Sequence, residues 1–319
     1  MANQKKAAAS KRPARTAKPA KSKPAKSRRA LVVTKAPRKA AKAAPSGEAA
    51  VKPRPPKPFV KWAGGKRQLL GEIRRHIPAD FGTYHEPFLG GGAVFFALPP
   101  GTAARLSDLN LRLVRTYRGI QTNVGKVIDL LNGYRRERDF FEKMRQRDID
   151  KGTDVEVAAW FIFLNKTGFN GLYRVNSKNQ FNVPFGAHTK NARFFDEANL
   201  RACSESLQSA QIEHQDFEQS LAHVKKGDVV YFDPPYVPLS STANFTSYTA
   251  ERFGEKDQER LRDAALTLKK LGAHVILSNS SSAAHLYDEA VFSTKKVLAA
   301  RPVNSKGDRR GKIAELLIT

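Results

Sequence analysis

The sequence predicts an α/β protein, because short β-type segments alternate with amphipathic helical segments from Phe59 onward. Several of the expected strands run directly into glycine-rich or acidic segments, and ligands bind at that edge of an open α/β sheet. The length of 319 residues is sufficient for one large or two ordinary domains, each with its own core.

The expected elements begin with a helix over 66–76, which carries Leu69, Leu70 and Ile73 and is ended by Pro78. Strands are expected at 83–87, 103–108, 211–215, 229–233 and 273–279, with a helix at 257–271. Between 110 and 199 the strand signal nearly vanishes, and helical runs at 140–146 and 155–165 surround a polar, Gly-containing segment. We therefore expect a mainly helical domain over 111–199, inserted into a main domain formed by 58–110 and 200–319.

The first 57 residues are a region of Ala, Lys, Pro and Arg without an aromatic side chain. They hold 18 Lys and Arg against one acid, Glu48, which is +17 of the formal net charge of +26. Such a composition buries too little apolar surface to offset the entropy of ordering, so we expect a disordered basic tail. The tail either keeps the protein soluble or binds nucleic-acid phosphates without reading their sequence.

The single cysteine, Cys203, rules out a disulfide within the chain and a Cys-rich zinc site, so we expect no metal and a reducing, cytoplasmic compartment. No window approaches 18 consecutive apolar residues, and the basic start lacks the apolar core of a secretory signal. These features predict a soluble protein without a membrane partner.

The first candidate ligand segment is PFVKWAGGK at 58–66. Its glycines let backbone approach a ligand, Trp62 offers an apolar face, and Lys66 suits the carboxylate of a zwitterion. A glycine turn before a helix, with Trp62 in the core, is the alternative.

The second segment is HEPFLGGGAVFF at 85–96, a strand that runs into three glycines and admits a nucleoside against bare backbone. It is not the GxGxxG fingerprint, and no Walker lysine follows, so a triphosphate is not indicated. Close packing of backbone is the alternative here.

A third feature is a pair of acids, Asp108 in LSDLN and Asp216 in HQDF, each just after an expected strand. Carboxylates at this place accept hydrogen bonds from ribose hydroxyls or from a nucleobase amine. For either acid taken singly, loop solvation or helix N-capping is the alternative.

The fourth and most specific segment is VVYFDPPY at 229–236. An apolar strand delivers Asp233, and Pro234 and Pro235 stiffen the turn that leads to Tyr236. An exocyclic amine fits between the Asp233 carboxylate and the Pro234 carbonyl, with Tyr236 stacked on the base. The alternative is a strand-terminating turn with a half-buried tyrosine.

In this order, the four segments resemble the Dam-like (D12) class of DNA adenine N6-methyltransferases over about 59–319. The resemblance includes FLNKTGFNGLYRVN (163–176), FNVPFG (181–186), SNS (278–280) and the closing KIAELLIT. It implies a Rossmann-like sheet that binds S-adenosylmethionine, with 111–199 as the target-recognition domain. The implied reaction is methyl transfer from S-adenosylmethionine to N6 of adenine in double-stranded DNA.

The resemblance also implies roles for particular residues. A flipped-out adenine would be held by Asp233, Pro234, Pro235 and Tyr236, where Asp233 and the Pro234 carbonyl accept the two amine hydrogens and draw N6 toward tetrahedral geometry. No cysteine is needed, since N6 attacks directly. Contacts to the cofactor are implied for Trp62, Lys66, Glu86, Pro87, Phe88, Gly90, Gly91, Gly92, Asp108, Asp216, Phe217 and Asp233.

Segment 168–182 resembles the β-hairpin with which this family reads its site. Phe169 would insert into the gap, and Arg174 would pair with a guanine edge. A solvated basic hairpin is the alternative. GATC is the expected target, although Ala187 and His188 replace a basic and an aromatic residue of the best-known GATC-methylating members. DNA contacts are implied for Lys61, Phe169, Asn170, Leu172, Arg174 and Asn176.

Three other functions remain open: a cytosine N4-methyltransferase, in which Ser usually replaces Asp233, an RNA N6-adenine methyltransferase, and a nucleoid DNA-binding protein whose methyltransferase domain is inactive. The resemblance leads us to expect a monomer in the bacterial cytoplasm, associated with the nucleoid. A restriction endonuclease is a candidate partner.

Overall fold

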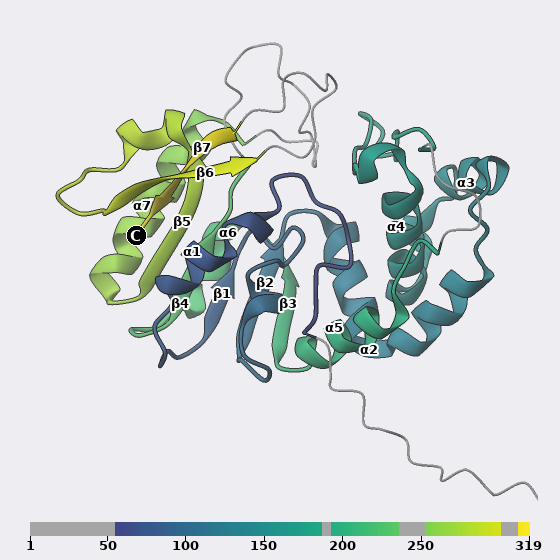
Figure 1. Ribbon diagram of the computed structural model, residues 1–319, viewed down its shortest axis with the longest axis horizontal. Helices are drawn as coiled ribbons and strands as arrows, with labels where there is room; N and C mark the ends of the chain where they lie inside the picture. The colour runs from purple at the N-terminus through teal and green to yellow at the C-terminus, as the bar shows by residue number, and fades with distance from the viewer. Residues whose placement is uncertain (1–54, 187–192, 236–252, 301–311) are drawn as a thin grey trace, which may run out of the picture. The chain divides into compact units, whose positions relative to one another are not determined.

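The computed structural model describes residues 55–186, 193–235, 253–300 and 312–319. The expected basic tail falls almost wholly outside these residues, as do Ala187, His188 and Tyr236. The described part of the chain is a mixed α/β structure around a seven-stranded sheet, with further helices beside the sheet (Figure 1). None of its helices combines the length and the apolar character that crossing a bilayer requires.

The sheet has the strand order β3-β2-β1-β4-β5-β7-β6. Strands β1 to β5 pair in parallel, whereas β7 is antiparallel to both of its neighbours, β5 and β6. The order reverses between β1 and β4, which is the switch point where open α/β sheets bind ligands. The strands are β1 (Tyr84–Glu86), β2 (Ala104–Asp108), β3 (Ala210–His214), β4 (Val229–Phe232), β5 (His274–Ser280), β6 (Thr294–Ala300) and β7 (Lys312–Ile318).

Strand β4 is apolar throughout because it is buried on both faces of the sheet, as expected for a central parallel strand. Val229 and Tyr231 belong to one hydrophobic cluster and Val230 and Phe232 to another, since successive side chains point to opposite faces. The sheet therefore divides the core into two clusters and presents only its strand ends to a ligand.

The helices begin and end at recognisable signals. Asn110 caps α2 by accepting a hydrogen bond from Leu113, and Thr153 and Glu156 form a capping box at the start of α4. The α-helices are α1 (Leu70–Arg75), α2 (Leu111–Gly133), α3 (Arg138–Arg145), α4 (Asp154–Thr167), α5 (Glu197–Leu207), α6 (Phe217–Ser220) and α7 (Glu255–Leu271). Short 3₁₀ helices are η1 (Lys66–Gln68), η2 (Phe95–Ala97), η3 (Ile149–Lys151), η4 (Phe169–Gly171), η5 (Leu221–His223) and η6 (Ser281–Leu286).

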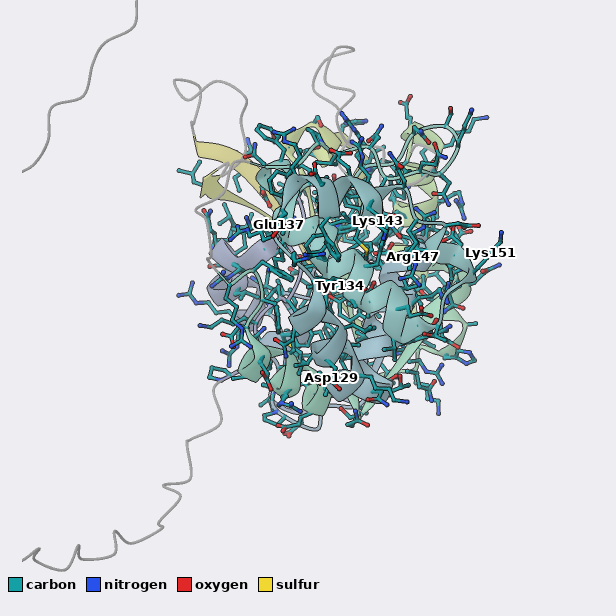
Figure 2. All side chains as sticks on the ribbon, turned by 90° about the vertical axis from the view of Figure 1, so that its right-hand side faces the viewer. Asp129, Tyr134, Glu137, Lys143, Arg147 and Lys151 are labelled. Atoms are coloured by element: carbon teal, nitrogen blue, oxygen red, sulfur yellow. The ribbon has the colours of Figure 1, made fainter. Side chains whose placement is uncertain are left out.

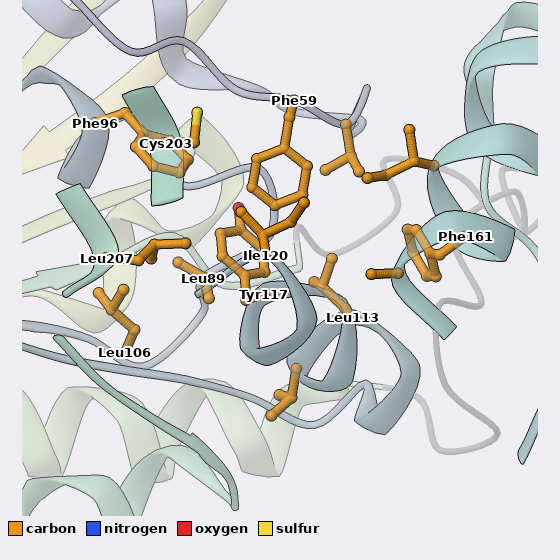
Figure 3. Close-up of a cluster of buried hydrophobic side chains, with 14 of the residues drawn as sticks. Phe59, Leu89, Phe96, Leu106, Leu113, Tyr117, Ile120, Phe161, Cys203 and Leu207 are labelled. Carbon is orange, nitrogen blue, oxygen red and sulfur yellow. The ribbon is translucent and has the colours of Figure 1, made fainter. Parts of the chain in front are cut away.

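Helix α2 connects the sheet to the helices beside it. Its residues Leu113, Tyr117 and Ile120 share one buried cluster with Leu106 of β2 and Phe161 of α4 (Figure 3). The helix is interrupted at Asn123, whose side chain accepts from the Lys126 N–H and so caps the second half. The expected inserted region thus begins with a helix that packs on the sheet as well as on α4.

The five expected strands are confirmed to within about two residues, and the expected helices correspond to η1 with α1, α3, α4 and α7. Strands β6 and β7 were not predicted. β6 lies at the edge of the sheet, so its two lysines do not require burial. β7 is antiparallel to both of its neighbours, β5 and β6, and this pairing is not visible in the sequence of β7 alone.

Candidate active site

Three of the acids singled out in the sequence lie at the carboxyl ends of adjacent parallel strands. Glu86 ends β1, Asp108 ends β2, and Asp233 directly follows β4. Because β1 lies between β2 and β4, the three carboxyl groups share one edge of the sheet. The structure therefore gathers residues that are far apart in the sequence at the topological switch point.

The glycine segment after β1 is held as bare backbone beside Asp108. Gly90 has φ +47°, and a Cβ atom at this position would lie 2.7 Å from Cδ1 of Trp62. Only glycine meets both conditions. The Gly90 N–H donates to Asp108 Oδ2 at 3.0 Å, and the Tyr117 hydroxyl donates to the Gly90 carbonyl at 3.1 Å. Gly91 and Gly92 continue the same turn.

Asp108 is fixed by backbone on both sides. Its Oδ2 accepts from Gly90 and its Oδ1 accepts from the Asn110 N–H at 2.9 Å. Burial raises the pKa of Asp108, and these two hydrogen bonds oppose the rise. Each carboxylate oxygen has a second lone pair, so the group can still accept hydrogen bonds from hydroxyl groups.

Glu86 is the most deeply buried acid of the site, with 2% of its surface exposed. Its Oε2 accepts from the Tyr84 hydroxyl at 2.9 Å and from the Phe95 N–H at 3.2 Å. Burial raises the pKa of Glu86 to about 8; the nearby Asp233 adds to the rise and the Tyr84 hydroxyl opposes it. A positive charge placed beside Glu86 would therefore favour its ionised form.

Three phenylalanine side chains pack together near the end of β1 and the start of α6. Phe88 stacks on Phe217 with ring centroids 5.4 Å apart and meets Phe253 edge-on at 5.6 Å. Pro87, which precedes Phe88, is buried. The guanidinium of Arg260 lies 4.9 Å from the centroid of Phe217. Because Phe217 is buried, the partly exposed Phe88 is the ring of this stacked pair on which a purine can stack.

Asp216 caps α6 and is paired with an arginine. Its Oδ1 accepts from the Glu218 N–H at 3.0 Å and lies 2.9 Å from Nη2 of Arg260. The helix-capping role that the sequence left open is therefore present. Arg260 also pairs with Glu218 and Asp257, which fixes Asp216 and Phe217 relative to α7.

Lys66 forms an ion pair with Asp233. Its Nζ lies 2.6 Å from Asp233 Oδ1 and 3.7 Å from Glu315 Oε2, and it donates to the Gly64 carbonyl at 2.7 Å. Only 3% of Lys66 is exposed. The sequence suggested a ligand carboxylate for this lysine, whereas the structure directs it to the carboxylate of the DPPY segment. Burial raises the pKa of Asp233, and the Lys66 charge opposes the rise.

The turn after Asp233 is supported from α7 and β5. Pro234 is buried, and the Pro235 carbonyl accepts from Gln258 Nε2 at 3.3 Å. Gln258 in turn accepts from Asn279 Nδ2 at 2.8 Å, and both side chains are buried. The SNS segment of the sequence thus fixes the turn through Gln258.

The segment 168–182 forms a hairpin-like loop. Asn182 N–H donates to the Arg174 carbonyl at 3.0 Å, and Asn176 N–H donates to the Gln180 carbonyl at 2.9 Å. Asn182 Oδ1 also accepts from Arg174 Nε at 2.8 Å, which orients the guanidinium. The Asn176 side chain closes the turn by accepting from the Lys178 and Gln180 N–H groups.

The start of this hairpin presents an exposed ring. Phe169 is 50% exposed, although large apolar side chains are usually covered. Asn170 has φ +54°, a conformation that asparagine tolerates, and Leu172 is partly buried. Lys61 is exposed and lies against Gly171, where a Cβ atom would be 2.2 Å from Lys61 Cδ. The structure therefore brings Lys61 to the hairpin.

The face formed by α3 and its neighbours carries charges of both signs (Figure 2). Arg147 pairs with Glu156 at 2.6 Å, and Lys151 pairs with Asp148 at 2.9 Å. These ion pairs offset the positive charge of the two basic side chains. The face lacks the uniform positive charge of a DNA-binding surface.

Several residues of the site were missed in the sequence. Three of them, Tyr117, Gln258 and Arg260, act through contacts with distant segments, for which a single sequence carries no signal. Tyr84 instead bonds Glu86 two residues further along the same strand. Asn165 had a usable signal, because it is a polar residue in the buried apolar run of α4. Among the described residues, no three His, Cys, Asp or Glu side chains are grouped to hold a metal ion.

The model of one protein family, the D12 class N6 adenine-specific DNA methyltransferase, matches residues 62–301. The chain belongs to this family. It is therefore an adenine-specific DNA methyltransferase. The matched residues of this D12 class enzyme include the glycine loop, Asp108, the hairpin and Asp233, whereas Lys61 and Glu315 lie outside the match.

Similar proteins include two Type II methyltransferases and a DNA adenine methylase. The D12 class enzyme is 45% identical over 273 residues to M1.LlaDCHI of Lactococcus lactis subsp. cremoris, covering 82% of this chain and 95% of that protein. It is 42% identical over 287 residues to M.MjaIII of Methanocaldococcus jannaschii, covering 82% and 98%. The DNA adenine methylase of Haemophilus influenzae is 34% identical over 271 residues, covering 82% and 92%.

Proposed function

We propose that the enzyme transfers the methyl group of S-adenosylmethionine to N6 of an adenine flipped out of double-stranded DNA, and that Asp233 receives the adenine amine. The main support is the partly buried Asp233 carboxylate at the switch point of the sheet, with Nζ of the buried Lys66 2.6 Å from its Oδ1. The glycine loop and Asp108 lie on the adjacent strands, so a nucleoside-bearing cofactor would reach the same edge.

The residues present fit this cofactor. Asp108 would accept the ribose hydroxyls, and the bare backbone at Gly90 permits close approach. Phe88, which stacks on the buried Phe217, offers an apolar surface for the adenine ring. Glu86 would favour the positive charge of the cofactor. When bound, S-adenosylmethionine supplies an electrophilic methyl group on its sulfonium.

Asp233 and Pro234 would prepare the adenine amine for attack. The N6 lone pair is delocalised into the ring, and acceptors for its two hydrogens favour the tetrahedral geometry that attack requires. Lys66 contacts Asp233 Oδ1, so Oδ2 is available to the amine together with the Pro234 carbonyl. Burial raises the Asp233 pKa, and the positive charge of Lys66 opposes this rise and so favours the ionised form of the acceptor. Tyr236, outside the described residues, is proposed to stack on the base.

For DNA recognition we propose residues 111–199 as the recognition domain, with the hairpin reading base edges, and 58–110 with 200–319 as the catalytic domain. The exposed Phe169 and the oriented Arg174 support this division. GATC is the proposed target. The names of the Type II relatives favour a restriction–modification setting with an endonuclease partner, and we propose a monomer acting on the bacterial nucleoid.

The proposal is tested by incubating duplex DNA of mixed sequence with methyl-tritiated S-adenosylmethionine and mapping every methylated base. We expect label on adenine N6 within one short sequence. Label on cytosine N4, or preferential labelling of RNA offered in the same reaction, would assign the other base or nucleic acid. Absence of label together with absence of cofactor binding would show an inactive site.

A further inference from the structure

Asn165 joins the cofactor-side loop to the recognition hairpin. It lies near the end of α4 and is fully buried, with 0% of its surface exposed. Its Oδ1 accepts from the Lys61 N–H at 2.7 Å, and its Nδ2 donates to the carbonyls of Lys61 at 2.9 Å and Gly171 at 2.8 Å. One side chain therefore binds backbone groups of both segments.

The neighbouring aromatic residues connect the same two segments. Trp62 stacks on Phe161 of α4 and on Tyr173 of the hairpin, with ring centroids 6.3 Å and 6.0 Å apart. Trp62 also lies against Gly90 of the glycine loop, where there is no space for a Cβ atom. The hairpin, Trp62 and the glycine loop are thus in continuous contact.

We propose that Asn165 is a positioning residue that makes cofactor binding and target recognition interdependent. A shift of the hairpin on DNA would be transmitted through the Gly171 carbonyl and the Lys61 peptide to Trp62, and from Trp62 to the glycine loop. This inference rests on the proposed cofactor and DNA sites. It predicts that each ligand raises the affinity of the enzyme for the other by the same factor.

The chain offers a matched comparison in Asn199 of α5. Asn199 Oδ1 accepts from the Lys57 N–H at 2.9 Å, and its Nδ2 donates to the Lys57 carbonyl at 2.8 Å. It therefore holds the same N-terminal segment by the same pair of bonds as Asn165. Asn199 has no hydrogen bond to the hairpin among the described residues.

The experiment measures S-adenosylhomocysteine binding by calorimetry, with and without a duplex carrying the mapped methylation sequence. It compares the wild-type enzyme with the Asn165→Ala and Asn199→Ala variants. We expect the duplex to tighten binding at least about fivefold in the wild type and in Asn199→Ala. In Asn165→Ala the factor should be clearly smaller than in Asn199→Ala, because the stack of Trp62 on Tyr173 is then the remaining contact between the hairpin and Trp62.

Thermal unfolding shows whether the variants are folded. If Asn165→Ala does not fold, Asn165→Asp serves, because it keeps the size and the acceptor for Lys61 but can donate to at most one of the two carbonyls, and only when protonated. A factor preserved in the folded variant, or a factor of one in the wild type, would overturn the inference and leave the proposed function in place. A wild type that does not bind S-adenosylhomocysteine would overturn both.

Discussion

The ionisation of Glu86 gives the site a pH dependence of known sign. Its pKa is raised to about 8 by burial, so the carboxyl group is mostly protonated at neutral pH. The folded state keeps this proton at pH values where the unfolded chain has lost it. The contribution of Glu86 to the free energy of unfolding therefore decreases as the pH rises from about 4.5 to about 8.

We expect the affinity for the cationic cofactor to increase from pH 6 to about 8 and then to level off, because only the ionised Glu86 attracts positive charge. Glu86→Gln keeps an acceptor for the Tyr84 hydroxyl but cannot ionise, so its affinity should vary much less with pH. Calorimetric titration of S-adenosylmethionine across this range makes the comparison. Since Asp108 and Asp233 also have raised pKa values, some variation should persist; an unchanged slope in Glu86→Gln would contradict the assignment.

For single residues, the sequence indicated the kind of chemical group that a side chain contacts better than it indicated which residue supplies that group. Lys66 was expected to meet a carboxylate, and it does, but the carboxylate belongs to Asp233. The fold brings the first residue of η1 next to the residue that follows β4. No local sequence pattern predicts that these two segments lie together. For the same reason the sequence of the closing KIAELLIT segment predicted no role for Glu315, which lies 3.7 Å from Lys66.

Within the hairpin, Arg174 is the side chain proposed to read a base edge. We expect Arg174→Ala to relax base preference at one position, with a loss of about 1–3 kcal/mol of discrimination if the contact to guanine is bidentate. Competition between duplexes that differ at one base pair measures this loss.

The control for Arg174 is Arg201→Ala, which removes an exposed arginine of α5 that pairs with Glu197 at 2.9 Å. This variant should keep the wild-type preference. If Arg174→Ala instead weakens binding to all duplexes equally, Arg174 contacts phosphate rather than a base.

The elements that could be predicted are those whose burial imposes a pattern. Strand β4 is apolar on both faces, and α7 carries an apolar stripe of buried Leu261, Ala265 and Leu268. α2 was expected only as part of a helical region, because its pattern is interrupted at Asn123. The order of the strands could not be read from alternation, since it depends on pairing between distant segments.

For the whole molecule, the basic tail is expected to act through phosphates alone. The first 57 residues carry +17 of the net charge but no aromatic residue that would read bases. Deleting residues 1–55 should weaken DNA affinity and flatten the dependence of log K on log salt. Site preference and single-turnover methyl transfer at saturating DNA should remain nearly unchanged.

Binding isotherms at several salt concentrations test the deletion. The change in slope should be smaller than 18 basic residues would produce, because only part of this charge contacts phosphate at any one time. Full affinity and an unchanged slope would instead assign the tail to solubility. A loss of site preference would show that recognition extends into the first 55 residues.

Asp233 is proposed to bind the adenine amine rather than to anchor the cofactor, which the resemblance also implied, and other residues are proposed to bind the cofactor. The most direct measurement is the single-turnover rate of Asp233→Ala at saturating DNA, together with its affinity for S-adenosylmethionine. We predict that the rate falls at least about 100-fold, because an acceptor for the reacting amine is lost, while the cofactor affinity stays within a few-fold of the wild type. A near-normal rate, or a cofactor affinity lost in parallel with the rate, would contradict this account.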